Sequence, residues 1–526
     1  MKTLKTDVLV IGGGSAAIRA ALEAARAGAE VLLVDKGSPG QSGSSPVALV
    51  GFSGLLGDET DSEELFLQDW IKASGGICDR NLVLQVIRQG RDLAQDLSTL
   101  GVEFISNPDG SWFIARRAGH SARRTIMVKG HANAMLPVRA AALKAGVQIC
   151  EGVMVTRLLQ AEGRAVGALG VTATGELHFF HARATVLAAG GANRLYTNLC
   201  EEIVDPVHRT LGDSYALAFH AGVPLVDMEF TQFRDSPPAG PIFGAQYVNA
   251  LGERVMLKYD PVALECAPRA TMAKAVYTEN MEGRGPVVWK VEADQVKRSR
   301  APVGQQYVAG MIVPITLMFQ RLMGGARIDE HAATTLPGLF AAGESCGGIQ
   351  GGDRMQGCGF CETQVFGAIA GRSAAAYARF RERPSVDPDA IEAERRRLHA
   401  PDGDQDPQDF IARVQAITWE KAGVVCERSK LLEAVAELEK LRREQASRLN
   451  RTRLFAALEA ANLALTAELV ARAKLTREES RSAHHRSDFP AADERWVRHV
   501  TLTRAGNDAV QISSAPVITT VARTAA

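Results

Sequence analysis

Glycines between two apolar segments carry the clearest chemical signal in this chain. Gly12 and Gly14 follow the apolar run Val8–Ile11 and begin a helix-patterned segment, and a second apolar run ends at Asp35. The order strand, glycine turn, helix, strand, acid is typical of a dinucleotide site, where the glycine backbone approaches a pyrophosphate at the positive end of the helix. Asp35 is placed to accept hydrogen bonds from a ribose. We therefore predict a dinucleotide site here, rather than an ordinary glycine-bearing βαβ unit.

Two later segments repeat the combination of a buried strand and a glycine turn. They are ARATVLAAGGANRLY at residues 182–196 and LFAAGE at residues 339–344. A loop of small residues, 36–54, follows the acid, and a helix start is expected at Asp213. Small residues let a backbone approach a flat cofactor closely. These segments indicate an α/β domain in which the chain returns to the far side of the cofactor.

The composition excludes several classes of protein. The 526 residues suffice for two or three domains with large cores. Lys+Arg and Asp+Glu both total 60, so no net charge favours nucleic acid or an anionic membrane. No apolar run reaches the about 18 residues of a spanning helix, and Asp7 and Arg19 interrupt any secretory signal. The eight cysteines form no disulfide-like framework, which favours a reducing, cytoplasmic location.

Changes along the chain predict an inserted domain and a separate C-terminal part. Residues 237–326 carry scattered prolines and few buried runs, whereas 410–475 show long helical periodicity. A stripe of leucines, from Leu431 to Leu441, is typical of a helix-bundle core, with a partner-binding coiled coil as the alternative. The expected division is 1–236 and 327–382 for the cofactor domain, 237–326 for the inserted domain, 383–407 for a linker, 408–480 for a helical domain and 481–526 for a C-terminal extension.

Several segments together resemble one family, the flavoprotein subunits of succinate dehydrogenase and fumarate reductase with aspartate oxidase. They include DVLVIGGGSAAIRAALEAARAG, TVLAAGG, GDSYALAFHAGVPLVDMEFTQF, LPGLFAAGESCGGIQGGDRM and ESRSAHHRSDFP, in the family's order. The resemblance implies FAD as the cofactor. It also implies an α/β fold, in which a Rossmann-like FAD-binding domain carries an inserted α+β capping domain and is followed by a C-terminal helical bundle.

The resemblance implies contacts to FAD at matched positions. Membrane-bound members attach the flavin to a histidine in a Ser-His-Thr segment, which here reads Ser42-Gly43-Ser44, so FAD is expected to be non-covalent. Glu344 matches the glutamate at the ribityl chain, and the backbone of Gly359 and Phe360 matches the pyrimidine end of the flavin. The expected FAD-binding residues are Gly12, Gly14, Ser15, Ala16, Asp35, Lys36, Ser42, Gly43, Ser44, Ala189, Gly190, Asp213, Glu344, Gly359 and Phe360.

The family's catalytic positions are arginines and histidines. Arg269, in Pro268-Arg269-Ala270, matches the arginine that donates a proton, with a surface salt bridge as the alternative. Arg354 matches an arginine that clamps the substrate, since a guanidinium offers a planar fork of donors to a carboxylate. Arg234 and Gln320 stand where the family has histidines.

Other positions in the expected substrate pocket also depart from the family. A segment with dicarboxylate contacts is shortened to PAGPIFGAQ, residues 238–246. Arg117 stands where aspartate oxidase has a glutamate. The resemblance therefore does not predict a fumarate, succinate or aspartate pocket.

Two cysteines and two histidines could take part in other chemistry, as redox groups or metal ligands. Cys358 and Cys361 form a CxxC that could exchange electrons with a flavin, but free cysteines also pack well beside glycine loops. No fourth ligand is spaced for a metal, so none is expected. His484 and His485 are expected to be structural.

We expect an FAD-dependent oxidoreductase that exchanges hydride with a small anionic, carboxylate-type substrate. An alternative is a flavoprotein electron-transfer subunit with a divergent substrate site and an iron–sulfur partner. An NAD-linked dehydrogenase is disfavoured, because the second glycine strand and the capping domain would be superfluous for it. The sequence leaves the substrate, the reaction direction and the oligomeric state open.

Overall fold

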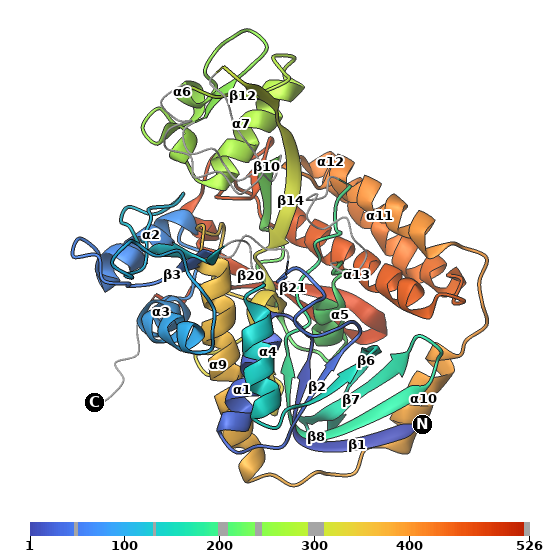
Figure 1. The fold of residues 1–526 in the computed structure, drawn as a ribbon. Helices are drawn as coiled ribbons and strands as arrows, with labels where there is room; N and C mark the ends of the chain where they lie inside the picture. Colours follow the sequence, from blue (N-terminus) through green and yellow to red (C-terminus); the bar gives the residue numbers. More distant parts are fainter. Residues whose placement is uncertain (47–50, 130–132, 198–208, 237–244, 293–309, 520–526) are drawn as a thin grey trace.

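A parallel sheet forms the base of the molecule (Figure 1). The computed structural model describes all residues except 47–50, 130–132, 198–208, 237–244, 293–309 and 520–526. The strands lie in the order β5, β2, β1, β8 and β16, all parallel, with the bounds Gln148–Glu151, Val31–Asp35, Lys2–Ile11, Leu177–Leu187 and Leu339–Ala341. The apolar run Val8–Ile11 is buried within β1, as expected for a strand covered on both faces.

An antiparallel extension continues this sheet. β7 (Arg164–Thr172) pairs with the first half of β8, and β6 (Val153–Ala161) pairs with β7. The buried strand expected after residue 182 is therefore the second half of a longer strand, because β8 pairs with β7 along its first half and with β16 at its end.

Helices cover the sheet and bring the glycine turn against a second small-residue helix. α1 (Ser15–Arg26) and α9 (Cys358–Arg379) lie side by side (Figure 1). A Cβ added at Gly367 or Gly371 would lie 2.8 or 2.2 Å from the carbonyl oxygen of Ala16 or Ala20. These glycines therefore allow the close packing of the two helices. The other helices of this region are α2 (Glu63–Ala73), α3 (Arg80–Thr99) and α4 (Met135–Lys144).

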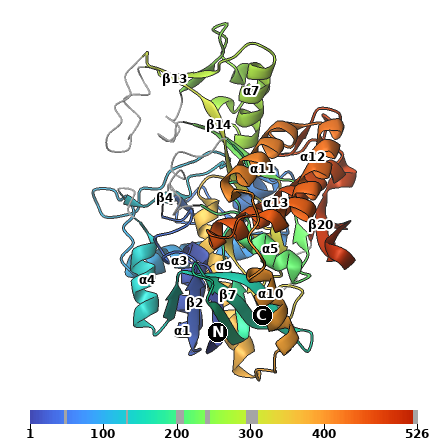
Figure 2. The ribbon, with the colours of Figure 1, turned by 90° about the vertical axis from the view of Figure 1, so that its right-hand side faces the viewer.

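The capping domain stands above this body (Figures 1 and 2). Its three-stranded antiparallel sheet contains β11 (Gln246–Val248), β12 (Val288–Lys290) and β13 (Ile312–Pro314). Two longer strands, β10 (Thr231–Ser236) and β14 (Thr316–Leu322), pair with each other and connect the cap to the body. Its helices are α6 (Met256–Tyr259) and α7 (Arg269–Met281). The expected α+β cap is confirmed.

Three long helices form the C-terminal bundle. They are α11 (Pro407–Lys421), α12 (Arg428–Lys440) and α13 (Leu454–Thr476), and α13 also packs on α5 (Asp213–His220). Leu431, Leu438 and Leu441 are buried, whereas Leu432 is 49% exposed at the edge of the stripe. By length and composition α13 could cross a membrane, but it is mostly buried in the protein, as the core helix of a bundle is.

The segment expected to be a linker, 383–407, contains a helix. α10 (Pro388–Leu398) begins with proline at its first turn, and the side chain of Asp387 accepts a hydrogen bond from the amide of Asp389. Leu398 packs with Met154 and Leu159 of the antiparallel strand β6. The charge and prolines that suggested a linker are thus those of an amphipathic helix and its cap. The domain limits themselves stay a prediction.

Residues 498–516 return to the body. The hairpin of β20 (Arg498–Ala505) and β21 (Ala509–Pro516) extends a sheet with β9 (Leu225–Val226), β15 (Gly325–Arg327) and β17 (Cys346–Gly347). His499 on β20 is buried between Asp227 and Asp79, with nitrogen–oxygen distances of 2.8 and 3.1 Å. Two short pairs complete the strands, β3 (Gly51–Ser53) with β4 (Thr125–Met127) and β18 (Val425–Cys426) with β19 (His485–Arg486).

Candidate functional site

A cavity of about 630 Å³ opens where β1, β2, β8 and β16 end. Most of the predicted cofactor residues line it, namely Gly14, Ser15, Ala16, Asp35, Lys36, Ser42, Gly43, Ser44, Ala189, Gly190 and Glu344. The start of α13, from its N-cap Arg453 through Phe455, closes one side, which sequence reasoning did not anticipate. The structure therefore brings segments from the whole length of the chain to one cavity.

The glycine turn at this cavity is packed too tightly for any side chain. Gly12 has a φ of +119°, and a Cβ there would lie 2.3 Å from the carbonyl oxygen of Ala188. Gly12 therefore lies behind the cavity and holds β1 against β8, rather than lining it. Gly13, which the sequence analysis did not single out, also has no room for a side chain. A Cβ added there would lie 2.5 Å from Asp35 Oδ2. Gly14 is the N-cap of α1, so the N-terminus of this helix lies at the cavity, and its first amide, that of Ser15, donates a hydrogen bond of 3.0 Å to Ser45 Oγ.

Two charged residues at the end of β2 lie in different surroundings. Ser42 Oγ donates a hydrogen bond of 2.8 Å to Asp35 Oδ2, and burial raises the pKa of the Asp35 carboxyl. Lys36 Nζ instead binds Asp213 of α5 at 2.6 Å and Glu459 of α13 at 2.5 Å. Asp213 therefore reaches the cavity only through Lys36. The contact with Glu459 joins the helical bundle to the cofactor domain.

Glu344 connects the cavity to the base of the cap. Its Oε1 accepts a hydrogen bond of 3.3 Å from the amide of Leu322 at the end of β14. A Cβ at Gly191 would lie 2.2 Å from the same oxygen, so Gly191 must lack a side chain. Burial raises the pKa of the Glu344 carboxyl, against the opposing charge of Arg321.

The cavity fits FAD on these observations. Its volume lies in the range of about 300–1,000 Å³ found for ligand pockets. It combines a helix N-terminus for a pyrophosphate, a buried acid at the tip of β2 for a ribose, and glycine backbones that permit close approach.

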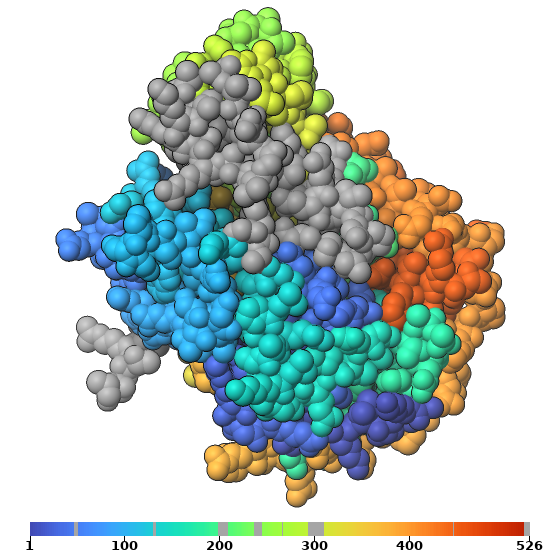
Figure 3. All heavy atoms as spheres, viewed as in Figure 1, coloured from blue at the N-terminus to red at the C-terminus, as the bar shows by residue number. Residues whose placement is uncertain are grey.

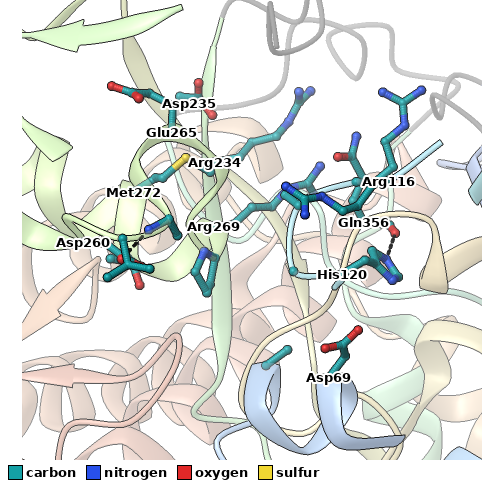
Figure 4. Close-up of a pocket in the computed structure, with 18 of the residues that line it drawn as sticks. Asp69, Arg116, His120, Arg234, Asp235, Asp260, Glu265, Arg269, Met272 and Gln356 are labelled. Carbon is teal, nitrogen blue, oxygen red and sulfur yellow. Dashed lines mark hydrogen bonds between the residues drawn. The ribbon is translucent and has the colours of Figure 1, made fainter. Parts of the chain in front are cut away.

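A second pocket, of about 430 Å³, lies between the cap and the body (Figure 4). Arg234 of β10 and Arg269, the first residue of α7, both line it. Arg269 donates a short hydrogen bond to Gln320 Oε1. Arg354 Nη2 donates to Gln232 Oε1 at 3.2 Å, and Gln232 lies two residues before Arg234 on the same strand. The four predicted catalytic positions, Arg234, Arg269, Gln320 and Arg354, are therefore gathered at one place.

The arginines at and beside this pocket concentrate positive charge in a partly buried place. Burial lowers the pKa of Arg269 to about 10, and the neighbouring Arg234 acts in the same direction. Burial also lowers the pKa of Arg354 to about 9, with Arg269 and Arg321 acting in the same direction. Both guanidinium groups stay charged at pH 7. Mutual repulsion in a buried place makes an anion a favourable occupant.

Asp353 holds the two halves of the site together, and sequence reasoning missed it. Its Oδ2 accepts a hydrogen bond of 3.2 Å from the amide of Ala270, at the start of α7. Its Oδ1 accepts one of 2.8 Å from the amide of Arg354 and a short one from Gln232. Asp353 thus fixes Arg269 relative to Arg354. The only signal was its place beside Arg354 in the GGDRM segment.

Gly359 and Phe360 do not line the larger cavity. A Cβ at Gly359 would lie 2.8 Å from Arg354 Nη1, so the guanidinium lies over the first turn of α9. Phe360 packs edge-on against Phe52, with ring centroids 5.8 Å apart. Their predicted contact with the flavin stays a prediction.

The cysteines of the CxxC are buried, and the structure favours the packing interpretation. Burial raises the pKa of Cys358 to about 12 and that of Cys361 well above its usual range, so both thiols are protonated. Within the described residues, no three Cys, His, Asp or Glu side chains gather as metal ligands. His484 is buried with Nε2 3.1 Å from the carbonyl oxygen of Arg477, and His485 is also buried, as in a structural role.

Known proteins match this chain over almost its whole length. Residues 7–360 match a family described as FAD binding domain, and residues 411–525 match one described as fumarate reductase flavoprotein C-term. One of the subunits of the fumarate reductase (CoM/CoB) of Methanothermobacter marburgensis is 32% identical, over 95% of this chain and 97% of its own length. L-aspartate oxidase of Caulobacter vibrioides is also 32% identical, and the alignment covers 94% of this chain and 96% of that oxidase.

The fold agrees with these matches. The FrdA chain of E. coli quinol fumarate reductase superposes with a TM-score of 0.89 at 24% identity, covering 100% of this chain and 99% of that chain. FAD as the cofactor and the resemblance inferred from the sequence are thereby confirmed. The chain belongs to the fumarate reductase/succinate dehydrogenase flavoprotein family, and it is an FAD-dependent oxidoreductase.

Proposed function

We propose that this oxidoreductase acts on a small, carboxylate-type anion, with bound FAD supplying hydride exchange with a substrate carbon. The observation that carries the proposal is the pair Arg234 and Arg269, which line a pocket beside the cofactor domain, with Arg354 close to Arg269. Positive charges held together and partly removed from water destabilise the folded protein unless a bound anion balances them.

Each arginine has a separate task in this proposal. Arg269 holds the proton that is exchanged with the substrate, because it lines the pocket and burial brings its pKa down to about 10. Arg354 and Arg234 orient the acid group of the substrate by charge-assisted hydrogen bonds. Gln320 accepts a hydrogen bond from Arg269 and so fixes the direction of its guanidinium. Tyr247, Trp289 and Met272 of the cap are buried around the pocket and exclude water.

The substrate is not expected to be fumarate, succinate or aspartate. Arg234 and Gln320 replace two histidines that the family uses, and Arg117 replaces the glutamate of aspartate oxidase. The shortened segment 238–246 lies mostly outside the described residues, so its contribution to the pocket stays a sequence-based expectation.

An electron-transfer protein with an iron–sulfur partner is the second candidate. The altered positions Arg234 and Gln320 favour it, and one relative is named as one of the subunits of a fumarate reductase. In that case the flavin would pass electrons to a partner protein, and the arginine pocket would bind anions without turning them over.

Anaerobic reoxidation separates the two candidates. The flavin of the purified protein is photoreduced and then mixed with a panel of unsaturated acids, adenylyl sulfate and dioxygen, with no partner protein present. The proposal predicts rapid reoxidation by at least one unsaturated acid. Reoxidation by none of the small acceptors, with rapid reoxidation by an iron–sulfur protein, would favour the second candidate.

FAD should be bound without a covalent link. Gly43 stands at the position of the linking histidine, and the neighbouring Ser42 and Ser44 offer no nucleophilic nitrogen. Acid precipitation of the holoprotein is expected to leave the yellow chromophore in the supernatant. A flavin peptide that stays in the pellet would contradict this expectation.

Asp35→Ala should weaken FAD binding while leaving the fold intact. A charge-assisted hydrogen bond to the ribose contributes roughly 1.5–3 kcal/mol, so the Kd for FAD should rise about 10- to 150-fold. Burial disfavours the Asp35 carboxylate, so the melting temperature of the apoprotein should not fall. Titration of the apoprotein with FAD measures the change, and Asp109→Ala, on an exposed loop, is the control. An unchanged Kd in Asp35→Ala would show that Asp35 does not contact the ribose.

A further inference from the structure

Helix α7 of the cap begins without a capping side chain of its own. Its first residue is Arg269, the residue before it is Pro268, which has no side-chain acceptor, and no acid lies in its first turn. The first amides and the positive end of a helix need an acceptor from elsewhere. Asp353 of the body supplies it, because its Oδ2 accepts a hydrogen bond of 3.2 Å from the amide of Ala270.

The same carboxylate holds strand β10, which connects the cap to the body. Gln232 Oε1 accepts a hydrogen bond of 3.2 Å from Arg354 Nη2. A guanidinium only donates, so the amide nitrogen of Gln232 faces Asp353 and donates to its Oδ1. The register between β10 and β14 shifts between Gln232 and Phe233. Because such an irregularity bends its strand, Asp353 binds β10 at a place where the strand can bend.

The contacts of Asp353 require a carboxylate. Its side chain is buried, and its partners are three N–H groups, those of the Ala270 amide, the Arg354 amide and the Gln232 side chain. A protonated acid or an amide would turn one of the two acceptor ends into a donor, which would then face another N–H. Burial raises the pKa of the Asp353 carboxyl, whereas the three hydrogen bonds and the charge of Arg269 oppose this shift.

Two other titratable groups near the start of α7 do not replace Asp353. His485, which follows α13, forms a hydrogen bond with the backbone of Ala270, but burial lowers its pKa to about 3, so its ring is neutral. Asp235 accepts a hydrogen bond of 2.6 Å from Tyr247 of the cap sheet, so it contacts the cap itself rather than the body. The negative charge that joins this helix start to the body is therefore that of Asp353.

We propose that Asp353 is a positioning residue that holds the cap closed over the substrate pocket. Figure 3 shows the cap, in green and yellow-green at the top, projecting from the body, and the pocket lies between the two. By capping α7 and fixing β10, Asp353 brings Arg269 and Arg234 of the cap together with Arg354 of the body. The inference rests on the proposed function, since it takes this pocket as the substrate site.

Hydrogen exchange of the substrate-free holoprotein tests the contact itself. Mass spectrometry follows peptides of α7 in the cap and of β1 and α1 in the body. Asp353→Asn keeps the size of the side chain but loses the charge and one acceptor. The exchange rate of α7 is expected to rise about tenfold or more, the factor that corresponds to losing a hydrogen bond to a charged group. The exchange of β1 and α1 and the FAD content should stay at wild-type values.

Two further variants assign the effect to this contact. Gln232→Met removes one donor from Asp353 but leaves its charge and its bond to α7, so it should raise the exchange of α7 by a smaller factor. Asp329→Asn is the matched control. Asp329 also accepts hydrogen bonds from two backbone amides, those of His331 and Ala333 at 2.9 Å, but within one loop of the body. The exchange of α7 should not change in this control.

The kinetics of Asp353→Asn separate a positioning residue from one that only stabilises the fold. If part of the protein is open, the apparent affinity falls with the closed fraction, so KM should rise at least about fivefold while kcat at saturation stays within about threefold of wild type. The substrate is the unsaturated acid that reoxidises the flavin fastest in the panel described above. A residue that only stabilises the fold would lower the FAD content and leave the KM of the remaining holoprotein unchanged.

The outcomes distinguish this inference from the proposed function. If α7 exchanges at the wild-type rate in both Asp353→Asn and Gln232→Met, or if Asp353→Asn keeps the wild-type KM, Asp353 does not hold the cap closed, and rapid reoxidation of the wild-type flavin leaves the proposed function intact. If no unsaturated acid reoxidises the wild-type flavin, the proposed function fails, and the exchange of α7 alone decides whether Asp353 holds the cap.

Discussion

Replacing Arg269 by alanine is expected to lower kcat by roughly 10²–10⁴-fold, the usual effect of losing a positioned proton donor. Arg269 begins α7, lines the pocket and donates a hydrogen bond to Gln320. Arginine is ordinarily a poor acid, but burial and Arg234 lower the pKa of Arg269 to about 10. In a closed pocket, a cationic donor stabilises negative charge on the substrate as it delivers the proton.

The test of Arg269 is a comparison of kcat and ligand binding among four proteins. Arg269→Lys keeps the charge but loses the planar fork, so it should rescue little of the rate. Lys274→Ala, on the same helix but outside the pocket lining, should keep wild-type kcat. The FAD absorption spectrum should be the same in all four proteins. If Arg269→Ala retained more than about a tenth of wild-type kcat, Arg234 would become the candidate proton donor.

Gly12→Ala is expected to prevent stable folding of the FAD-binding domain. The residue has a φ of +119°, and its new Cβ would lie 2.3 Å from the carbonyl oxygen of Ala188. The strained backbone costs roughly 1–3 kcal/mol, and forcing β1 away from β8 adds overpacking of roughly 1–3 kcal/mol. A buried backbone atom cannot move aside as a flexible side chain would. FAD content and melting temperature should therefore both fall sharply.

Gly28→Ala provides the matched control for Gly12. Gly28 also has a positive φ, +85°, and follows the same helix α1, but an added Cβ would have no atom within 4 Å. The Gly28→Ala variant should lose only about 1–2 kcal/mol of unfolding free energy, which is the cost of a left-handed conformation in a residue with a side chain. It should keep its full FAD content. The interpretation of the glycine turn would be contradicted if Gly12→Ala bound FAD as well as Gly28→Ala does.

The local part of the fold could be predicted from the sequence because its signals are short-range. The glycine turn between β1 and α1, with Asp35 ending β2, forms within thirty-five consecutive residues whose pattern has one favourable arrangement. The helical periodicity of residues 410–475 likewise predicted a helical domain, since a buried stripe of leucines requires only a helix, and the structure divides this domain into α11, α12 and α13.

The features of the fold and of the site that could not be predicted depend on contacts between residues far apart in the chain. Lys36 lines the cofactor cavity, but the contacts of its ammonium with Asp213 and Glu459 could not be predicted, because no local pattern connects these residues. Asp353 joins the cap to the body through the amide of Ala270, a backbone contact that leaves no sequence signature. Helix α10 resembled a linker because its apolar side is narrow and most of its residues are charged.

A crystal structure of the protein with FAD and a bound saturated diacid tests the central claim most directly. We predict FAD in the cavity lined by Gly14, Asp35 and Glu344, with no bond to residues 42–44, and a carboxylate of the diacid on Arg269. A diacid bound elsewhere on the protein, with the pocket of Arg234 and Arg269 filled only by water, would contradict the assignment of this pocket as the substrate site.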